Sequence, residues 1–335
     1  MNTTGCWDAE EVSTASAGTS ALPANTKLIF LVGAPRSGTT WLQLLLSASP
    51  AIATSAETYL FAEYTRSLFA AWQFYNGKQW PVGLHHLMSE AEYFALVREL
   101  ASKVMARILA MKPGATIVLE KTPDHALHWR NILAMFPDAR FVHIIRDPRA
   151  VVASLRDANR RWWSLAATQR IATNCSYWAT RVKAAREIAS ATENYIEVRY
   201  DDLSHDGVRT LQTVFAWSGV EVSAAQAAEI LDQHRIDRLR SRLAPGAAYP
   251  FDNRVDGMYR KGEVDGWRSD LTPRQVLLIE RLTRELMEEL EYAPADHGRP
   301  VWRSATILPA LLGDWVRNGL AWRMHKYGQA LGRGI

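Results

Sequence analysis

The chain has little cysteine and no long apolar run, and each shortage argues against a class of protein. Its 335 residues include two cysteines, Cys6 and Cys175, which show none of the short spacings that bind zinc. Nothing in the sequence supports a disulfide between them, so we expect a reducing, cytoplasmic compartment. No apolar stretch approaches the roughly 18 residues that indicate a membrane-spanning helix. Residues 1–25 lack the basic start and the apolar core of a secretory signal, and we expect a flexible tail there.

An excess of charge of one sign is also lacking. The chain has 39 Lys and Arg residues against 35 Asp and Glu residues, and its net charge is +4. Charge this balanced fits a small anionic ligand as well as it fits nucleic acid, so charge alone does not identify the partner. The motifs described below favour a small ligand, and we expect no nucleic-acid partner. At 48% hydrophobic residues, the chain can bury a large core, as one sizeable domain or two small ones.

One lysine is missing where a nucleotide-binding loop needs it. Residues 28–42 run from apolar strand formers through a Gly-rich turn into a helical pattern, which predicts an anion site at the helix start. Gly33 and Gly38 have the spacing of an ATP-type P-loop, but Thr39 stands at the position of its lysine. That lysine normally reaches the β- and γ-phosphates. The loop is therefore better suited to hold a shorter phosphate group, with Arg36 on its rim, than to hydrolyse a nucleoside triphosphate.

Short apolar strands alternate with helical segments along most of the chain. Strands are expected at 27–33, 117–121, 140–146 and 195–200, and helices from the loop to Ser47, at about 58–112, 126–136, from 150 onward, and at about 166–191, 207–240 and 273–291. This alternation predicts an α/β fold, with a P-loop-type parallel sheet and helices on both of its faces. We expect three regions: the flexible tail 1–25, a catalytic domain at 26–298, and a basic, Trp-rich amphipathic helical tail at 299–335.

Two further motifs carry cations toward the same edge of that sheet. A predicted strand delivers Arg146 at its carboxyl end, and Ser154 follows about two turns into a helix. Together they can clamp a second phosphate, although Arg146 in a structural ion pair beside a helix cap at Asp147 is an alternative. The third motif places Arg260 and Lys261 directly before a glycine, in a loop that precedes the last predicted helix. On its own this third motif is weak, because surface loops often carry such a pair.

The three motifs, in this order, resemble those of the sulfotransferases that use 3'-phosphoadenosine 5'-phosphosulfate (PAPS), and they are more similar to bacterial and carbohydrate-type members than to cytosolic small-molecule ones. The resemblance spans about Leu28 to Trp267. It implies that the 5'-phosphosulfate is held by Arg36, Ser37, Gly38, Thr39 and Thr40, that Trp41 and Tyr200 lie near the adenine, and that the 3'-phosphate is held by Arg146, Ser154, Arg260, Lys261 and Gly262. Many family members have lysine at the position of Arg36.

The resemblance also implies the groups that carry the chemistry. Sulfuryl transfer needs a cation on the bridging oxygen and a general base for the acceptor. Lys121 and Arg36 are the expected cations, and Glu57 is the expected base. His125 is the alternative base, but members with a histidine mechanism have Lys-Thr-His where this chain has Lys-Thr-Pro, with Pro123 in the histidine's place. The sequence offers no cluster with metal-ligand spacing, so we expect PAPS as donor and no metal.

The acceptor and the last segment are open to more than one interpretation. We expect sulfuryl transfer to a hydroxyl or an amine, and the position of Glu57 suggests a glycan, a lipid or another small-molecule acceptor. A P-loop kinase or NTPase is an alternative that Thr39 opposes, and a non-catalytic nucleotide-binding module would leave Lys121 without a role. The tail 299–335 either lies on a membrane surface as an interfacial helix or packs on the domain as its last helix.

Overall fold

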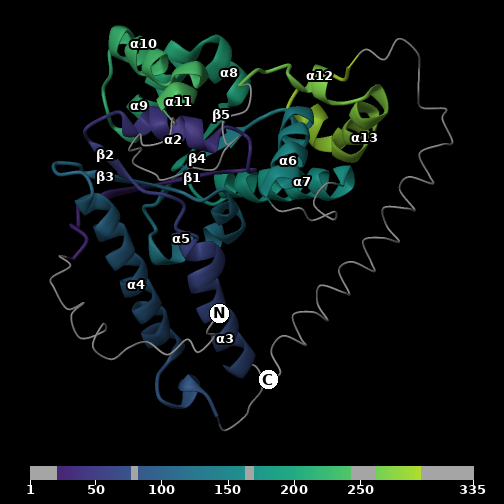
Figure 1. The fold of residues 1–335 in the computed structure, drawn as a ribbon. Coiled ribbons are helices and arrows are strands. Elements are labelled where there is room, and N and C mark those ends of the chain that lie inside the picture. Colours follow the sequence, from purple (N-terminus) through teal and green to yellow (C-terminus); the bar gives the residue numbers. More distant parts are fainter. Residues whose placement is uncertain (1–20, 77–81, 163–169, 243–261, 296–335) are drawn as a thin grey trace, which may run out of the picture.

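The computed structural model describes residues 21–76, 82–162, 170–242 and 262–295. They form a five-stranded sheet in the order β2-β3-β1-β4-β5, with helices on both faces (Figure 1). The strands are β1 (Lys27–Gly33), β2 (Ile52–Thr54), β3 (Ile117–Lys121), β4 (Arg140–Ile145) and β5 (Tyr195–Arg199). All neighbouring strands pair in parallel. The predicted α/β fold with a parallel sheet is confirmed.

The helices form three groups around this sheet. One face is covered by η2 (Leu60–Tyr64, a π-helix), α3 (Thr65–Asn76), α4 (Glu90–Ala110), the 3-10 helix η4 (Pro123–His128) and α5 (Trp129–Met135). The other face is covered by α2 (Thr39–Ser47), α8 (Tyr200–His205), α9 (Gly207–Ser218), α10 (Ala224–Gln233) and α11 (Ile236–Arg242). The third group packs on itself and comprises α6 (Pro148–Trp162), α7 (Ile171–Glu187), α12 (Trp267–Asp270) and α13 (Pro273–Glu289). Two short 3-10 helices, η3 (Leu84–His86) and η6 (Ile188–Ser190), follow α3 and α7.

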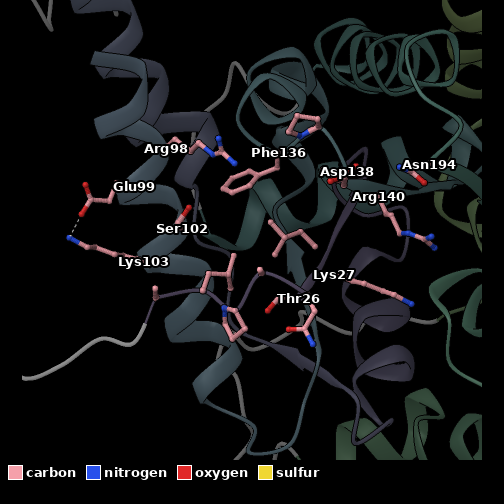
Figure 2. Close-up of a pocket in the computed structure, with 18 residues that line it drawn as sticks. Thr26, Lys27, Arg98, Glu99, Ser102, Lys103, Phe136, Asp138, Arg140 and Asn194 are labelled. Atoms are coloured by element: carbon pink, nitrogen blue, oxygen red, sulfur yellow. Dashed lines mark ion pairs between the residues drawn. The ribbon is translucent and has the colours of Figure 1, made fainter. Parts of the chain in front are cut away.

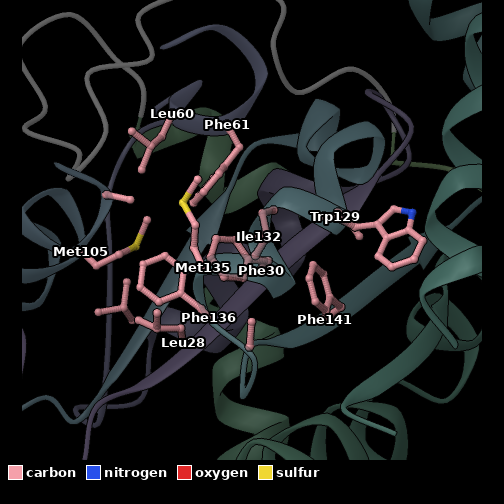
Figure 3. Packing of buried hydrophobic residues seen from close by; sticks show 14 of the residues in the cluster. Leu28, Phe30, Leu60, Phe61, Met105, Trp129, Ile132, Met135, Phe136 and Phe141 are labelled. Atoms are coloured by element: carbon pink, nitrogen blue, oxygen red, sulfur yellow. The ribbon is translucent and has the colours of Figure 1, made fainter. Parts of the chain in front are cut away.

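The alternation of side chains along β1 explains how one apolar strand supports two cores. Leu28, Phe30 and Val32 belong to the cluster on the face of α4 and α5, whereas Ile29 and Leu31 belong to the cluster on the face of α2 and α9. Side chains of a strand point alternately to opposite faces, so a central strand buried on both sides is apolar throughout. Figure 3 shows the first cluster, where Phe30 lies among aromatic and aliphatic side chains from the helices and from β4.

The structure differs from the expected elements in three places. The segment after Pro50, expected to be irregular, contributes the edge strand β2, which pairs with β3 through only three residues. Such a strand is too short for periodicity to reveal it. The helix expected at 126–136 is a 3-10 helix that begins at Pro123, followed by α5. Tyr200, expected at the end of a strand, instead begins α8.

The order of the strands places the functional motifs together. β1 lies between β3 and β4, so the loops that follow these three strands meet at one edge of the sheet. In parallel sheets this carboxyl edge is where ligands bind. Residues 1–20 of the expected flexible tail and the expected helical tail 299–335 lie outside the described residues. The domain boundaries at 26 and 298 stay predictions.

Candidate active site

The loop between β1 and α2 has a backbone that requires glycine. Gly38 precedes α2 with a φ of 97°, and Arg36 also has a positive φ, of 73°. A Cβ atom on Gly38 would lie 2.6 Å from Cδ2 of Tyr200, so a larger residue would clash as well as strain the backbone. The Ser37 N–H donates to the carbonyl of Ala34 at 3.1 Å and closes the turn. The chain therefore passes from strand to helix within a few residues.

The start of α2 is suited to an anion. The first N–H groups of this nine-residue helix have no acceptor within it, and the helix dipole is positive at this end. The side chain of Ser37 is fully buried there, and its Oγ has no hydrogen-bond partner in the part of the chain that the structure describes. A buried hydroxyl without a partner, beside a helix N-terminus, fits an oxygen of a phosphate or sulfate group.

Arg146 connects three segments at the carboxyl end of β4. Its guanidinium lies 3.9 Å above the ring of Tyr200. One terminal nitrogen donates to the carbonyl of Glu263 at 2.7 Å, and the other donates to the carbonyl of Arg36 at 3.4 Å. Among the described residues, its contacts are with backbone carbonyls and a ring face, and none of them is with a carboxylate. Within that part of the chain, the guanidinium has no ion pair.

Ser154 and Arg36 contact each other directly. Ser154 lies in α6, and its Oγ accepts a hydrogen bond from Nε of Arg36 at 3.0 Å. The sequence analysis predicts that Ser154 binds one phosphate and that Arg36 binds the other. The structure therefore brings these two residues into direct contact.

Aromatic rings form one wall beside these cations. The rings of Trp41 and Tyr200 lie 5.5 Å apart, and the indole N–H of Trp41 donates to the carbonyl of His234 at 3.0 Å. The Tyr200 hydroxyl donates to the carbonyl of Gly262 at 2.8 Å. Burial raises the pKa of Tyr200 despite the nearby guanidinium of Arg146, so this hydroxyl stays protonated. Each ring is thus held in place by a hydrogen bond to a backbone carbonyl.

These residues line a small cavity of about 90 Å³ that opens to the surface. Its lining residues are Arg36, Gly38, Thr39, Thr40, Trp41, Arg146, Ser154, Tyr200, Ile236 and Gly262. All of them except Ile236 are residues that the sequence analysis singles out. Arg260 and Lys261, which it also singles out, lie outside the described residues.

A second cluster lies beside the loop, at the carboxyl end of β3. Lys121 is the last residue of β3 and is almost fully buried, at 2% exposure. Its ammonium forms an ion pair with Glu57 and lies 3.4 Å from Oγ1 of Thr40. The Glu57 side chain is 27% exposed, so it reaches solvent on one side while it contacts the lysine on the other. The structure therefore brings the expected cation and the expected base together.

His125, the alternative base, is engaged at both ring nitrogens. Its Nε2 accepts a hydrogen bond from the backbone N–H of Phe61 at 3.0 Å. Its Nδ1 lies 2.7 Å from Oε2 of Glu120, and the ring is fully buried. Neither nitrogen is positioned to accept a proton from a molecule in the cleft.

Four side chains near this cluster were not predicted: Tyr59, Asp124, Tyr177 and Arg181. Tyr59 is hydrogen-bonded to Glu57, and burial together with the Glu57 charge raises the pKa of its phenol. Asp124 accepts hydrogen bonds from Nε of Arg181 at 2.7 Å and from the Tyr177 hydroxyl at 3.1 Å. Arg181 and Tyr177 come from α7, far away in sequence. Of these four, only Asp124, a charged residue three positions after the predicted strand 117–121, could have been noticed in the sequence.

A larger cavity of about 750 Å³ lies near the amino ends of the strands (Figure 2). Two of its four cations have partners: Lys103 pairs with Glu99 at 2.7 Å, and Arg140 donates to the carbonyl of Trp217. Asp138 adds a further negative charge to its lining. The cavity lies at the edge of the sheet opposite to the motifs. The smaller cavity and the Lys121 cluster are therefore the candidate active site.

Two other kinds of site were sought in the described residues. Within them, no group of His, Cys, Asp and Glu side chains is arranged to hold a metal ion. Across the same ranges, no helix has both the length and the apolar character needed to cross a bilayer.

Comparison with known proteins connects this geometry to one family. The model of the "Sulfotransferase family" matches residues 29–224, more than half of the chain. A Caenorhabditis briggsae protein named "Putative protein-tyrosine sulfotransferase" is 30% identical over 129 residues, which are 38% of this chain and 42% of that protein. The omega-hydroxy-beta-dihydromenaquinone-9 sulfotransferase Stf3 of Mycobacterium bovis is 27% identical over 115 residues, 31% of this chain and 29% of that protein. The chain thus spans less than half the length of these two curated relatives.

Solved structures share the fold. Mouse sulfotransferase SULT7A1, complexed with PAP, superposes with a TM-score of 0.54 at 19% identity, covering 81% of this chain and 91% of that one. The sulfotransferase domain from the curacin biosynthetic pathway gives a TM-score of 0.54 at 18% identity, covering 82% of this chain and 100% of that one. The matched range contains the loop before α2 and the positions of Glu57, Lys121, Arg146 and Ser154. The chain belongs to the sulfotransferase family.

Proposed function

We propose that this protein transfers a sulfuryl group from PAPS to a hydroxyl group of an acceptor. The observation that carries the proposal is the meeting of two clusters at one edge of the sheet. The loop before α2, with Arg36, Arg146 and Ser154, supplies an anion-binding cradle. The Lys121–Glu57 pair supplies a cation and a carboxylate beside it.

The donor would lie with its two phosphate ends in this cradle. The N–H groups at the start of α2 and the partnerless Ser37 hydroxyl suit the 5'-phosphosulfate. Arg146 and Ser154 suit the 3'-phosphate, because a guanidinium and a hydroxyl bind phosphate oxygens in a fixed geometry. Trp41 and Tyr200 offer ring faces to the adenine. Arg260, Lys261 and Gly262 are assigned to the 3'-phosphate by the family resemblance.

The transfer itself exchanges one S–O bond for another. The acceptor oxygen attacks sulfur, the bond from sulfur to the 5'-phosphate oxygen breaks, and adenosine 3',5'-bisphosphate leaves with that electron pair. Glu57 takes the acceptor proton, and its partial exposure lets it reach a molecule in the cleft. Lys121 neutralises the negative charge that develops on the leaving oxygen, and its burial strengthens this interaction. Arg36 contributes a second, more diffuse positive charge.

The surroundings of Glu57 favour an acceptor with an apolar body. Tyr59, Tyr64 and Leu68 follow it in sequence and are 44%, 63% and 37% exposed. Of these, Tyr59 interacts with Glu57, and its exposed ring beside the proposed base suits a hydroxylated lipid or another apolar small molecule. The names of the relatives point to hydroxyl acceptors as well: a menaquinone derivative in one case and protein tyrosine in the other.

The alternative of a P-loop kinase or NTPase is separated from this proposal by binding. Isothermal titration calorimetry would compare adenosine 3',5'-bisphosphate with ATP and with AMP. We expect the bisphosphate to bind more tightly than either, because Arg146 and Ser154 provide for a 3'-phosphate that the others lack. Tighter binding of ATP would overturn the proposed donor.

The acceptor class is tested by sulfation with labelled PAPS. Three probes cover the classes: farnesol as an isoprenoid alcohol, a tyrosine-containing acidic peptide, and an oligosaccharide of N-acetylglucosamine. We expect the label on farnesol in preference to the other two. Label on the peptide or the sugar alone would keep the reaction but reject the apolar acceptor.

A further inference from the structure

Beneath the Lys121–Glu57 pair lies a buried carboxylate with an unusual set of partners. Glu120 is 1% exposed and lies in β3, where the buried residues that precede it are apolar. Its Oε1 accepts hydrogen bonds from the hydroxyls of Thr58 at 2.7 Å and Thr122 at 2.8 Å. Its Oε2 lies 2.7 Å from Nδ1 of His125. Burial alone would raise the pKa of Glu120, but His125 and the two hydroxyls outweigh it and hold that pKa below its ordinary value.

His125 connects the segment that carries Glu57 to Glu120. The backbone N–H of Phe61 donates to Nε2 of its ring. The other ring nitrogen, Nδ1, lies 2.7 Å from Oε2 of Glu120. The ring therefore bridges Phe61 and Glu120, and both side chains are buried. An apolar side chain in place of His125 would remove both contacts.

All of these contacts converge on the segment that carries Glu57. The N–H of Tyr59 donates to Oγ1 of Thr122 at 3.3 Å, in addition to the hydroxyl contact of Thr58 and the N–H contact of Phe61. Tyr59 itself has a φ of 52°, a left-handed conformation that is rare for a side chain of this size. The π-helix η2 begins at the next residue. Strained backbone of this kind persists only where surrounding contacts hold it, and it often marks a functional site.

The side chains of two adjacent residues of β3 therefore point to opposite faces of the sheet. Lys121 points toward the loop before α2, where it meets Glu57 and Thr40. Glu120 points to the opposite face, where His125 lies against Phe61 with ring centroids 5.2 Å apart. The same strand thus holds the cation and, through the contacts of Glu120 and His125, the backbone that carries Glu57.

We propose that Glu120 and His125 are positioning residues: they hold backbone 58–61 in the one conformation that directs Glu57 at Lys121. The inference rests on the proposed function, in which Glu57 is the base. It assigns to His125 a role that is not proton transfer, although the residue lies in the motif where other members keep a catalytic histidine.

The test uses two substitutions of His125 and one matched control in the full-length protein. His125→Leu removes both polar contacts at similar volume, whereas His125→Gln keeps an acceptor for Phe61 and a donor for Glu120. His143→Leu removes another fully buried histidine, whose Nδ1 contacts Tyr195 and not the Glu57 segment. Turnover is measured with labelled PAPS and whichever of farnesol, the tyrosine peptide or the oligosaccharide the wild type sulfates fastest. Amide hydrogen exchange of residues 57–64 reports the backbone without any acceptor.

We expect His125→Leu to lower kcat about 10²-fold, the cost of misplacing a catalytic group by about an ångström. The donor KM and the binding of adenosine 3',5'-bisphosphate should be unchanged, and exchange at 57–64 should be faster. His125→Gln should restore most of kcat, and His143→Leu should retain it. Wild-type kcat and exchange in His125→Leu would overturn the inference, as would an equal loss of kcat in His143→Leu or no recovery in His125→Gln.

Two further measurements keep the outcomes distinct. If His125→Leu does not fold, Thr58→Val and Thr122→Val each remove one hydroxyl that contacts Glu120, and wild-type kcat in both would overturn the inference.

Glu57→Gln is assayed in parallel. If it retains turnover, the proposed base is wrong. If it loses turnover while His125→Leu retains it, only the positioning role fails.

Discussion

Replacing Arg146 by alanine should weaken the binding of adenosine 3',5'-bisphosphate by about 10- to 150-fold. In the structure the guanidinium contacts the carbonyls of Glu263 and Arg36 and the ring of Tyr200, and no carboxylate of the described residues pairs with it. Its positive charge is therefore available to a phosphate. Hydrogen bonds to a charged group contribute about 1.5–3 kcal/mol each, and about 1.4 kcal/mol corresponds to a tenfold change in affinity.

The assay is isothermal titration calorimetry with the bisphosphate, and Arg140→Ala is the control. Arg140 begins the same strand that Arg146 follows, and it lies at the opposite edge of the sheet, against Trp217. Its removal should leave the affinity unchanged. A third variant, Arg146→Lys, keeps the charge but loses the planar fork and the stacking on Tyr200, so it should fall between the wild type and alanine. Unchanged affinity in Arg146→Ala would refute the second phosphate position.

Three other predictions address different parts of the structure. Lys121→Ala should lower kcat more than it changes donor affinity, because the charge that Lys121 stabilises develops in the transition state. The measurement is steady-state kinetics, and weaker donor binding with a normal kcat at saturation would contradict the prediction. Gly38→Ala should abolish tight binding of the bisphosphate and lower the Tm, because the new Cβ would lie 2.6 Å from Cδ2 of Tyr200 and the residue has a φ of 97°. A melting curve and an affinity equal to those of the wild type would show that the loop tolerates a side chain. His143 is buried and uncharged, with a pKa lowered to about 3 by burial. Below pH about 6.5 the unfolded state therefore binds a proton that the folded state does not, and the free energy of unfolding decreases as the pH is lowered. Between pH 7 and 5 the wild type should lose about 2 kcal/mol more than His143→Leu in urea unfolding, and equal losses would contradict the assignment.

Much of the fold was predictable because its signals are local. An apolar strand, a Gly-rich turn and a helix follow one another within residues 28–47, and the structure has β1 and α2 there. Arg146 was placed at the carboxyl end of a strand by the same kind of pattern. The rule that parallel strands bind ligands at their carboxyl ends then brings these motifs to one edge.

The contacts that are distant in sequence were not predictable. The ion pair of Lys121 with Glu57 depends on how the segment after β2 returns over β3, and β2 is too short to show in the sequence. Glu120 was visible only as a charged residue in an apolar strand, which implies a partner but does not identify it. That partner is His125, brought close by the tight 3-10 turn that begins at Pro123.

The central claim is that the chain transfers a sulfuryl group from PAPS with Glu57 as the base, and one experiment tests it most directly. Wild type and Glu57→Gln are incubated with labelled PAPS and the three acceptor probes, and the sulfated product and adenosine 3',5'-bisphosphate are quantified together. The account predicts equal amounts of both products from the wild type. From Glu57→Gln it predicts turnover lower by about 10²- to 10⁴-fold, with unchanged affinity for the bisphosphate. No transfer by the wild type to any probe or to a cell extract, or full activity in Glu57→Gln, would contradict it.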